Sequence, residues 1–169
     1  MTVDSHDLPS ALGFTAADLE ANRRGALNHA QKERMKRIRR RNTFIAAAMF
    51  VALAMGATIL FYLGQLNRSL ILYSAGAILT MVNAFTVVRA GRAYMRIGVD
   101  LRRGKVEILT GEVERVLRRG RAIDSYMLRI NGVELNVSKE VFVGFRHMAS
   151  YRLYRAGVSR ILLSAESAI

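Results

Sequence analysis

The sequence has no cysteine, which excludes disulfide bonds and metal sites built on thiolate ligands. Acidic residues are also scarce, since 13 Asp and Glu stand against 26 Lys and Arg and leave a formal net charge of +13. Yet 51% of the 169 residues are apolar. Because apolar and charged residues compete for the surface of a soluble domain, we expect the two kinds to be segregated into different stretches.

Motifs that would indicate catalysis are missing as well. There is no glycine-rich phosphate loop and no ligand spacing typical of a metal site. His6, His29 and His147 are scattered along the chain, and no histidine or carboxylate near them is expected to make a ligand pair with any of them. Glu112 and Glu114 could act as an acid–base pair in principle, but nothing in the sequence gives them a pocket. We therefore expect no catalytic, metal-binding or cofactor-binding residues, and a protein that is not an enzyme.

Charge is absent from two long apolar runs, Thr43–Gly64 and Leu70–Val88. As helices they would be about 33 and 28 Å long, enough to cross a hydrocarbon core of about 30 Å. A buried core hairpin of a soluble protein is the alternative, but a soluble helix keeps a polar face and these runs are apolar on every side. With the short polar break Gly64–Ser69 between them, the runs predict a transmembrane helical hairpin with a tight turn.

Basic residues flank the outer ends of both runs, whereas the turn holds only Arg68. Short basic flanks stay on the cytoplasmic side, so we expect a multi-pass protein of the inner (plasma) membrane with both termini in the cytoplasm. The first forty residues lack the apolar core of a signal peptide, and targeting is expected to come from a later segment. The residues expected to contact anionic head groups are Lys36, Arg37, Arg39, Arg40, Arg41, Arg89, Arg92 and Arg96.

Small residues repeat every four positions in both runs, a spacing that lets helix backbones approach closely. Asn83 is the most polar group in either run and is expected to face a helix, because an amide in hydrocarbon needs a partner. Neither run contains Asp, Glu, Lys, Arg or His, which argues against a pump or transporter formed by this chain alone. Besides Asn83, the predicted residues of packing between the two spans, or against a partner, are Ala48, Ala52, Gly56, Gly76, Thr80 and Ala84.

The chain before the first run divides into a disordered tail, residues 1–13, and a helical basic arm on the cytoplasmic side, residues 14–41. Thr15 is a good N-cap with Asp18 at N3, and Gly25 is a stop signal. A second helix start at Asn28, with Gln31 at N3, is expected to lead into the first span. The sequence leaves open whether the short first helix packs on the chain's own β-domain or on another protein.

After Gly104 the helical spacing changes to alternation of apolar and polar residues. Residues 105–117 predict a long strand bent at Gly111, and Asn131-Gly132 predicts a two-residue hairpin turn between two further strands. A short helix over 139–146 and two strands around Gly157 complete the order. This order predicts a small five-stranded β-barrel over residues 104–169, OB-like with an SH3-like barrel as the alternative. It follows a transmembrane hairpin domain, residues 42–103, whose last part is a juxtamembrane helix.

Barrels of the OB type often bind oligonucleotides through aromatic and basic side chains. Here Tyr126 and Tyr151 fall on the inward side of their strands, and Phe142 and Phe145 fall on the core side of the short helix. Only Tyr154 is expected to face outward, so nucleic-acid binding is not the favoured interpretation. The basic residues available to such a site are Arg118, Arg119, Arg121, Arg129, Arg152 and Arg155.

Two stretches, "DLEANRRGAL" (Asp18–Leu27) and "YRLYRAGVSRILLSAE" (Tyr151–Glu166), resemble segments that bracket a two-span hairpin in uncharacterised bacterial membrane proteins. The resemblance implies a bacterial origin and the same architecture, and it brings no activity with it. More loosely, a membrane segment followed by a small barrel is similar to NfeD-type proteins, without a motif that could be transferred.

The sequence therefore favours an integral membrane accessory or scaffold protein that presents a small cytoplasmic β-barrel for protein contacts, without catalysis and without a cofactor. Its expected partners are anionic lipid head groups and either another protein or a second copy of the chain. The alternative is a membrane-anchored sensor that binds a ligand or nucleic acid.

Overall fold

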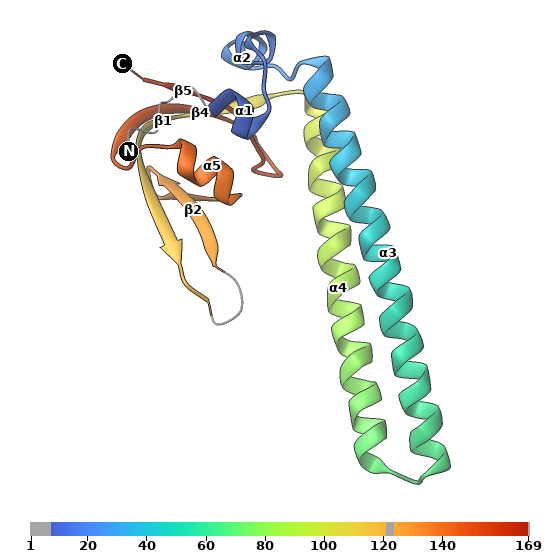
Figure 1. Ribbon diagram of the computed structural model, residues 1–169. Coiled ribbons are helices and arrows are strands. Elements are labelled where there is room, and N and C mark those ends of the chain that lie inside the picture. Colours follow the sequence, from blue (N-terminus) through green and yellow to red (C-terminus); the bar gives the residue numbers. More distant parts are fainter. Residues whose placement is uncertain (1–7, 121–123, 169) are drawn as a thin grey trace. The chain divides into compact units, whose positions relative to one another are not determined.

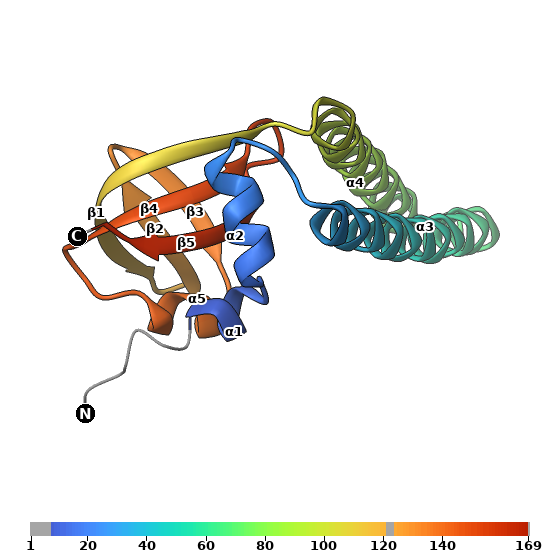
Figure 2. The same cartoon turned by 90° about the horizontal axis from the view of Figure 1, so that it is seen from above.

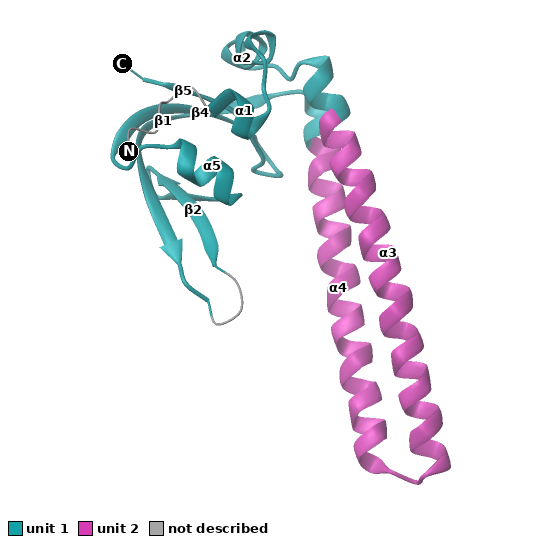
Figure 3. Ribbon diagram, in the orientation of Figure 1, with its two compact units in different colours: residues 1–33, 100–169 teal, residues 34–99 magenta. Residues whose placement is uncertain are grey.

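The computed structural model describes residues 8–120 and 124–168. The chain forms two compact units, which Figure 3 shows in different colours. One unit is residues 34–99, and the other combines residues 1–33 with residues 100–169. The second unit therefore contains the segments on both sides of the first, so that the first is an insertion into it. We call the two parts the helical unit and the β unit.

The helical unit is formed by an antiparallel pair of long helices, α3 (His29–Leu66) and α4 (Leu70–Arg103) (Figure 1). Their outer ends, residues 29–33 and 100–103, belong to the β unit (Figure 3). The 38 and 34 residues of α3 and α4 correspond to about 57 and 51 Å, and both helices are long and apolar enough to cross a membrane. They are joined by a turn in which Arg68 has a φ of 48°. The predicted helical hairpin is confirmed.

The N-terminal part of the β unit contains α1 (Leu8–Leu12) and α2 (Ala16–Arg23). The Thr15 hydroxyl accepts a hydrogen bond from the Asp18 backbone N–H at 3.2 Å, and the Asp18 carboxylate accepts one from the Thr15 N–H at 3.0 Å. This capping box starts α2 as predicted, and the chain leaves the helix at Gly25 with a φ of 75°. The start of α3 is also confirmed, because the Asn28 N–H donates to the Gln31 side chain at 3.2 Å.

The prediction of a disordered tail over residues 1–13 is wrong for residues 8–12, which form α1. Residues 1–7 lie outside the described part of the chain. Leu8 is only 4% exposed and belongs to the main apolar core. It packs against Gly144, where a Cβ atom would come within 3.1 Å of Leu8 Cδ2. A five-residue helix is too short to form on its own, so this contact, which is distant in sequence, stabilises it.

Within the part of the chain that the structure describes, the sheet has five antiparallel strands in the order β3-β2-β1-β4-β5, and Figure 2 shows how it curves. The long first strand is its centre, because residues 106–113 pair with β4 and residues 114–118 pair with β2. Gly111 lies close to this change of partner, and the Asn131 side chain occupies the space that a Cβ would need, with Oδ1 only 2.7 Å away. The strands are β1 (Val106–Arg118), β2 (Ser125–Ile130), β3 (Val133–Val137), β4 (Ala149–Ala156) and β5 (Leu162–Ser167).

The connections around β3 follow the predicted turn chemistry. Asn131 and Gly132 have φ values of 47° and 76°, the left-handed pair that a two-residue hairpin turn requires. Ser138 caps α5 (Lys139–Gly144) by accepting a hydrogen bond from the Val141 N–H at 3.4 Å. The helix ends at Gly144, two residues earlier than predicted, because Phe145 adopts an extended conformation at the C-cap.

The predicted β-barrel is not closed. Among the described residues the outer strands β3 and β5 do not pair with each other, and they remain the two edges of the sheet. The helices α1 and α5 contact each other, α1 also contacts β5, and α5 contacts β2. Leu8 of α1 and Phe142 of α5 belong to the same apolar core as Leu135 of β3 and Ala165 of β5. The coarser prediction, a helical hairpin joined to a small five-stranded β-domain, is confirmed.

The core of the β unit lies between the concave face of the sheet and α5. Val113, Leu128 and Leu153 are completely buried there, and they come from the three central strands. The rings of Phe145 and Tyr151 meet edge to face with centroids 4.8 Å apart, and the Tyr151 hydroxyl accepts a hydrogen bond from the Arg146 N–H at 3.1 Å. The predicted inward side of Tyr151 is thus confirmed.

We predict that Leu8→Ala lowers the free energy of unfolding of the β unit by about 2–5 kcal/mol, since it leaves a cavity against Gly144. Hydrogen exchange of the β1 and β4 amides in the full-length protein measures this change. Val143→Ala is the matched control, because Val143 is 43% exposed and should change the value by less than about 0.5 kcal/mol. Equal exchange rates in the two variants would show that α1 does not contribute to the core.

Candidate functional site

In the half of the hairpin that carries the turn, glycines of α3 and α4 lie against the facing helix. A Cβ on Gly76 would lie 3.1 Å from the Phe61 ring, and one on Gly56 would lie 3.1 Å from Leu79 Cδ2. Glycine at these positions lets the two backbones approach, as expected for helices packed in a membrane. The Asn83 amide donates to the Phe50 carbonyl oxygen of the facing helix at 3.3 Å, and only 7% of Asn83 is exposed.

The predicted packing residues occupy two different environments. Gly76 and Asn83 are buried against α3, and Gly56 is half-buried against α4. Ala48, Ala52, Thr80 and Ala84 are exposed instead. The buried and half-buried positions of α3 include residues 53, 57, 60 and 64, a spacing of 3.5 residues rather than four. A repeat of 3.5 residues keeps facing the partner helix in a left-handed helix pair. Residues that repeat every four positions gradually rotate out of the contact, which is why some of the predicted residues are exposed. That the exposed residues pack on a partner stays a prediction.

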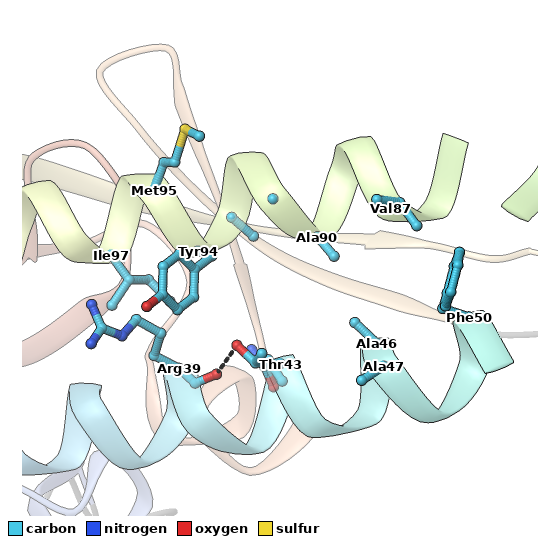
Figure 4. Close-up of a pocket in the computed structure, with 13 residues that line it drawn as sticks. Arg39, Thr43, Ala46, Ala47, Phe50, Val87, Ala90, Tyr94, Met95 and Ile97 are labelled. Atoms are coloured by element: carbon cyan, nitrogen blue, oxygen red, sulfur yellow. Dashed lines mark hydrogen bonds between the residues drawn. The ribbon is translucent and has the colours of Figure 1, made fainter. Parts of the chain in front are cut away.

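Near their outer ends α3 and α4 leave a groove of about 510 Å³ between them (Figure 4). Its walls in the middle are Ala46, Ala47, Ala90 and Gly91, which are too small to meet across the gap. Arg39 and Tyr94 lie at one end, and Phe50 and Val87 lie at the other. The groove is thus apolar along its length and polar at the end nearest the basic flanks.

The Arg39 guanidinium at the polar end lies over the Tyr94 ring, 4.7 Å from its centroid. The Thr43 hydroxyl donates to the Arg39 carbonyl oxygen at 2.9 Å, as a hydroxyl within an apolar helix commonly does. Arg39 is half-buried, while the other residues predicted to contact head groups are exposed: Lys36, Arg37, Arg40, Arg41, Arg89, Arg92 and Arg96. Head-group contact by these residues stays a prediction, and the structure brings Arg39 to the groove.

In the β unit, α2 packs on the outer face of the sheet. The Asn22 amide donates to Ser164 Oγ on β5 at 2.7 Å, and both residues are completely buried. The Arg23 guanidinium forms an ion pair with Glu166, whose side chain is 16% exposed. The sequence had left open where α2 packs, and these two contacts place it on the chain's own β5.

Tyr154 lies beneath this contact, and its predicted exposure is wrong. Alternation does place it on the face opposite Leu153, but it is 0% exposed. Its cross-strand partner is Ser164, which α2 contacts, and its hydroxyl donates to Glu166 at 2.6 Å. Burial raises the pKa of Tyr154, whereas the Arg23 hydrogen bond lowers the pKa of Glu166. A ring covered in this way offers no surface for base stacking.

The arginines that could have formed a basic binding surface are mostly paired with carboxylates of the same sheet. Arg129 bonds to Glu114 at 3.2 Å and to Glu134 at 2.8 Å, and hydrogen bonding to Arg129 lowers the pKa of Glu134. Glu114, one member of the possible acid–base pair, is thus engaged by an arginine on the sheet surface. Arg118, Arg152 and Arg155 pair with Glu134, Glu166 and Glu107, and Arg121 lies outside the described residues.

No group of three or more His, Asp and Glu side chains that could hold a metal ion occurs in the described ranges, 8–120 and 124–168. His147 has a different contact, because its Nδ1 accepts a hydrogen bond from the Arg115 backbone N–H at 3.1 Å. The groove was not predicted from the sequence. A signal for it exists in the facing small residues Ala46, Ala47, Ala90 and Gly91, which interrupt the larger apolar residues just inside the basic flanks.

We predict that Gly76→Leu lowers the free energy of unfolding of the helical hairpin by about 1–3 kcal/mol, because the new side chain overlaps the Phe61 ring. Thermal unfolding in mild detergent, followed by circular dichroism, measures the effect. Ala52→Leu adds a similar side chain at an exposed site and should leave the stability of a single chain unchanged. A loss of stability or a change in oligomeric size in the Ala52 variant would place Ala52 in a contact between chains.

No protein-family model matches the chain, no curated protein matches its sequence, and no solved structure matches its fold. The resemblance to two-span bacterial membrane proteins, and more loosely to NfeD-type architecture, therefore stays a prediction.

Proposed function

We propose that this chain is a non-enzymatic integral membrane protein that acts as an accessory or scaffold, with α3 and α4 in the inner (plasma) membrane and the β unit in the cytoplasm for protein contacts. The observation that carries the proposal is the insertion of the helical unit into the β unit. Because one folded unit contains the segments before α3 and after α4, both segments belong on the same side of a membrane.

Exposed apolar side chains support the membrane location. On α3 and α4, Phe44, Ile71 and Met81 are 75, 80 and 71% exposed in the isolated chain. Continuous apolar surface of this kind needs lipid or another protein to cover it. The basic flanks support the cytoplasmic side for both termini, since the turn between the spans holds only Arg68.

A backbone contact at the base of the hairpin supports the presentation of a folded β unit. Ala26 forms a β-bridge with Lys105, the Leu27 N–H donates to the Gly104 carbonyl at 3.0 Å, and the Val106 N–H donates to the Gly25 carbonyl at 2.9 Å. We call these paired segments, 25–27 and 104–106, the clasp. It ties the chain before α3 to the chain after α4 within the β unit.

Asp100 adds a second tie at the last turn of α4. Its carboxylate is 2% exposed and accepts hydrogen bonds from the N–H groups of Val158 and Ser159 at 2.9 and 2.6 Å. The turn between β4 and β5 is thus held by a residue of the membrane helix. A membrane helix whose last turn is hydrogen-bonded within the β unit suits a protein that holds this unit at the membrane.

For the β unit we propose an open, OB-like arrangement. The order of three meandering strands, α5 and two more strands supports it, as does the pairing of β1 with both β2 and β4. The edge strand β3 has only β2 as a neighbour in the described sheet, and edge strands offer free backbone groups for contacts with other proteins. The alternative function, an anchored sensor of a ligand or nucleic acid, has less support because the aromatic side chains of the domain pack in its interior.

The proposed function predicts that the full-length protein, purified in mild detergent, carries a stoichiometric membrane-protein partner or a second copy of itself. Mass spectrometry of the cross-linked complex identifies the composition, and absorbance at 260 nm reports nucleic acid in the same sample. A single chain without partner, holding nucleic acid that resists moderate salt, would favour the sensor instead.

The proposed topology predicts opposite labelling of two single cysteines, placed at Asn67 in the turn and at Ser167 near the C-terminus. Both positions are exposed, and the wild-type chain contains no cysteine that could react. An impermeant maleimide applied to intact cells should label the Asn67→Cys variant, while the Ser167→Cys variant should react only after lysis. The reverse pattern would contradict a cytoplasmic β unit.

A further inference from the structure

The groove at the polar end of the hairpin has room for a ligand. Gly91 lies on its wall, and a Cβ added there would meet no atom of the described residues within 4 Å. This contrasts with Gly56 and Gly76 further along the hairpin, where an added Cβ would come within 3.1 Å of the facing helix. Small residues therefore bring the helices into contact at one end and leave them apart at the other.

The dimensions of the groove suit a single acyl chain. From Arg39 to Phe50 the helix rises by about 16 Å, so the groove runs from the basic flank into the first apolar run, which begins at Thr43. A linear hydrocarbon chain is narrower than a helix with its side chains, which is about 10 Å across, so it suits a groove between two helices better than a helix of a second copy does.

The lining of the groove changes from polar at one end to apolar at the other. Thr43 and Tyr94 lie near Arg39 at one end (Figure 4), and the wall towards Phe50 is apolar. Asn42 also lines the groove. Residues 34–99 contain ten Lys and Arg and no Asp or Glu, and all of these cations except Arg68 lie at the outer ends of the helices. Charge complementarity therefore favours an anionic head group over a zwitterionic one.

We propose that the groove is a binding site for one anionic phospholipid, with an acyl chain between Ala46 and Gly91 and the phosphate beside Arg39. The inference rests on the membrane location proposed above. An acyl chain covers the apolar walls that the small residues leave unfilled, and a guanidinium is suited to bind phosphate through paired hydrogen bonds. The site differs from general head-group contact because it holds one lipid in a defined place.

The test is native mass spectrometry of the full-length protein in mild detergent, titrated with phosphatidylglycerol or with phosphatidylcholine. The wild type should carry one phosphatidylglycerol at concentrations where phosphatidylcholine binds several-fold less. Gly91→Leu should weaken phosphatidylglycerol binding by about tenfold or more, since it displaces the equivalent of at least two buried methylene groups. Ala46→Leu fills the groove from the facing helix and should act in the same way.

Matched variants separate the groove from the rest of the surface. Ala84→Leu adds the same side chain as Gly91→Leu at an exposed position of α4 outside the groove, and it should bind like the wild type. Arg39→Gln should reduce the preference for phosphatidylglycerol by about fivefold, whereas Arg68→Gln removes the same charge at the turn and should not.

Wild-type binding by both Gly91→Leu and Ala46→Leu would overturn the site, as would equal affinity for the two lipids. A dimer that Gly91→Leu abolishes would also overturn it, in favour of a second copy as the occupant. Carbonate extraction of cell membranes tests the proposed location separately. A protein that stays in the membrane fraction but lacks the bound lipid contradicts the groove alone, and a protein released by carbonate contradicts the membrane function itself.

Discussion

The contact of α2 with β5 is the interaction on which the β unit depends. The sheet has two open edges, and its outer face carries Tyr154 and Ser164, which would be exposed without α2. Asn22 and Arg23 bind Ser164 and Glu166 across more than 140 residues of sequence. Since α1 precedes α2 and places Leu8 in the core, the two helices α1 and α2 complete the domain. A fragment consisting of residues 104–169 alone would therefore lack both α1, which contributes to the core, and α2, which covers the outer face of the sheet.

The same contact explains why two distant stretches of the sequence belong together. Asp18–Leu27 contains the residues that cap α2, bind β5 and form one side of the clasp. Tyr151–Glu166 contains Ser164 and Glu166, the partners of Asn22 and Arg23 on β5. Asp18 also accepts a hydrogen bond from the Asn28 amide at 3.0 Å and so connects α2 to the start of α3. These two stretches carried the resemblance to two-span membrane proteins, and in this chain they pack on each other around the insertion point of the hairpin.

The helical unit uses small residues in two ways. At Gly56 and Gly76 they bring α3 and α4 together, and Asn83 adds a hydrogen bond to the facing backbone. At Ala46 and Gly91 the opposing side chains are small on both helices, and a groove results because no large residue fills the space. Arg39 lies at one end of this groove, so the groove proposed to hold a lipid chain is in the part of the hairpin richest in positive charge.

The sequence by itself determined the features that depend on local pattern. The uncharged runs, the capping box of Thr15 and Asp18, the Asn131-Gly132 turn and the order of strands were predictable because each depends on neighbouring residues. The α1 helix, the open barrel and the burial of Tyr154 were not, since each depends on contacts between distant segments. Alternation placed Tyr154 on the outer face, but only the tertiary structure decided that α2 covers that face. In the same way, small residues indicated close helix packing, and only the relative rotation of α3 and α4 decided which of them meet and which enclose a groove.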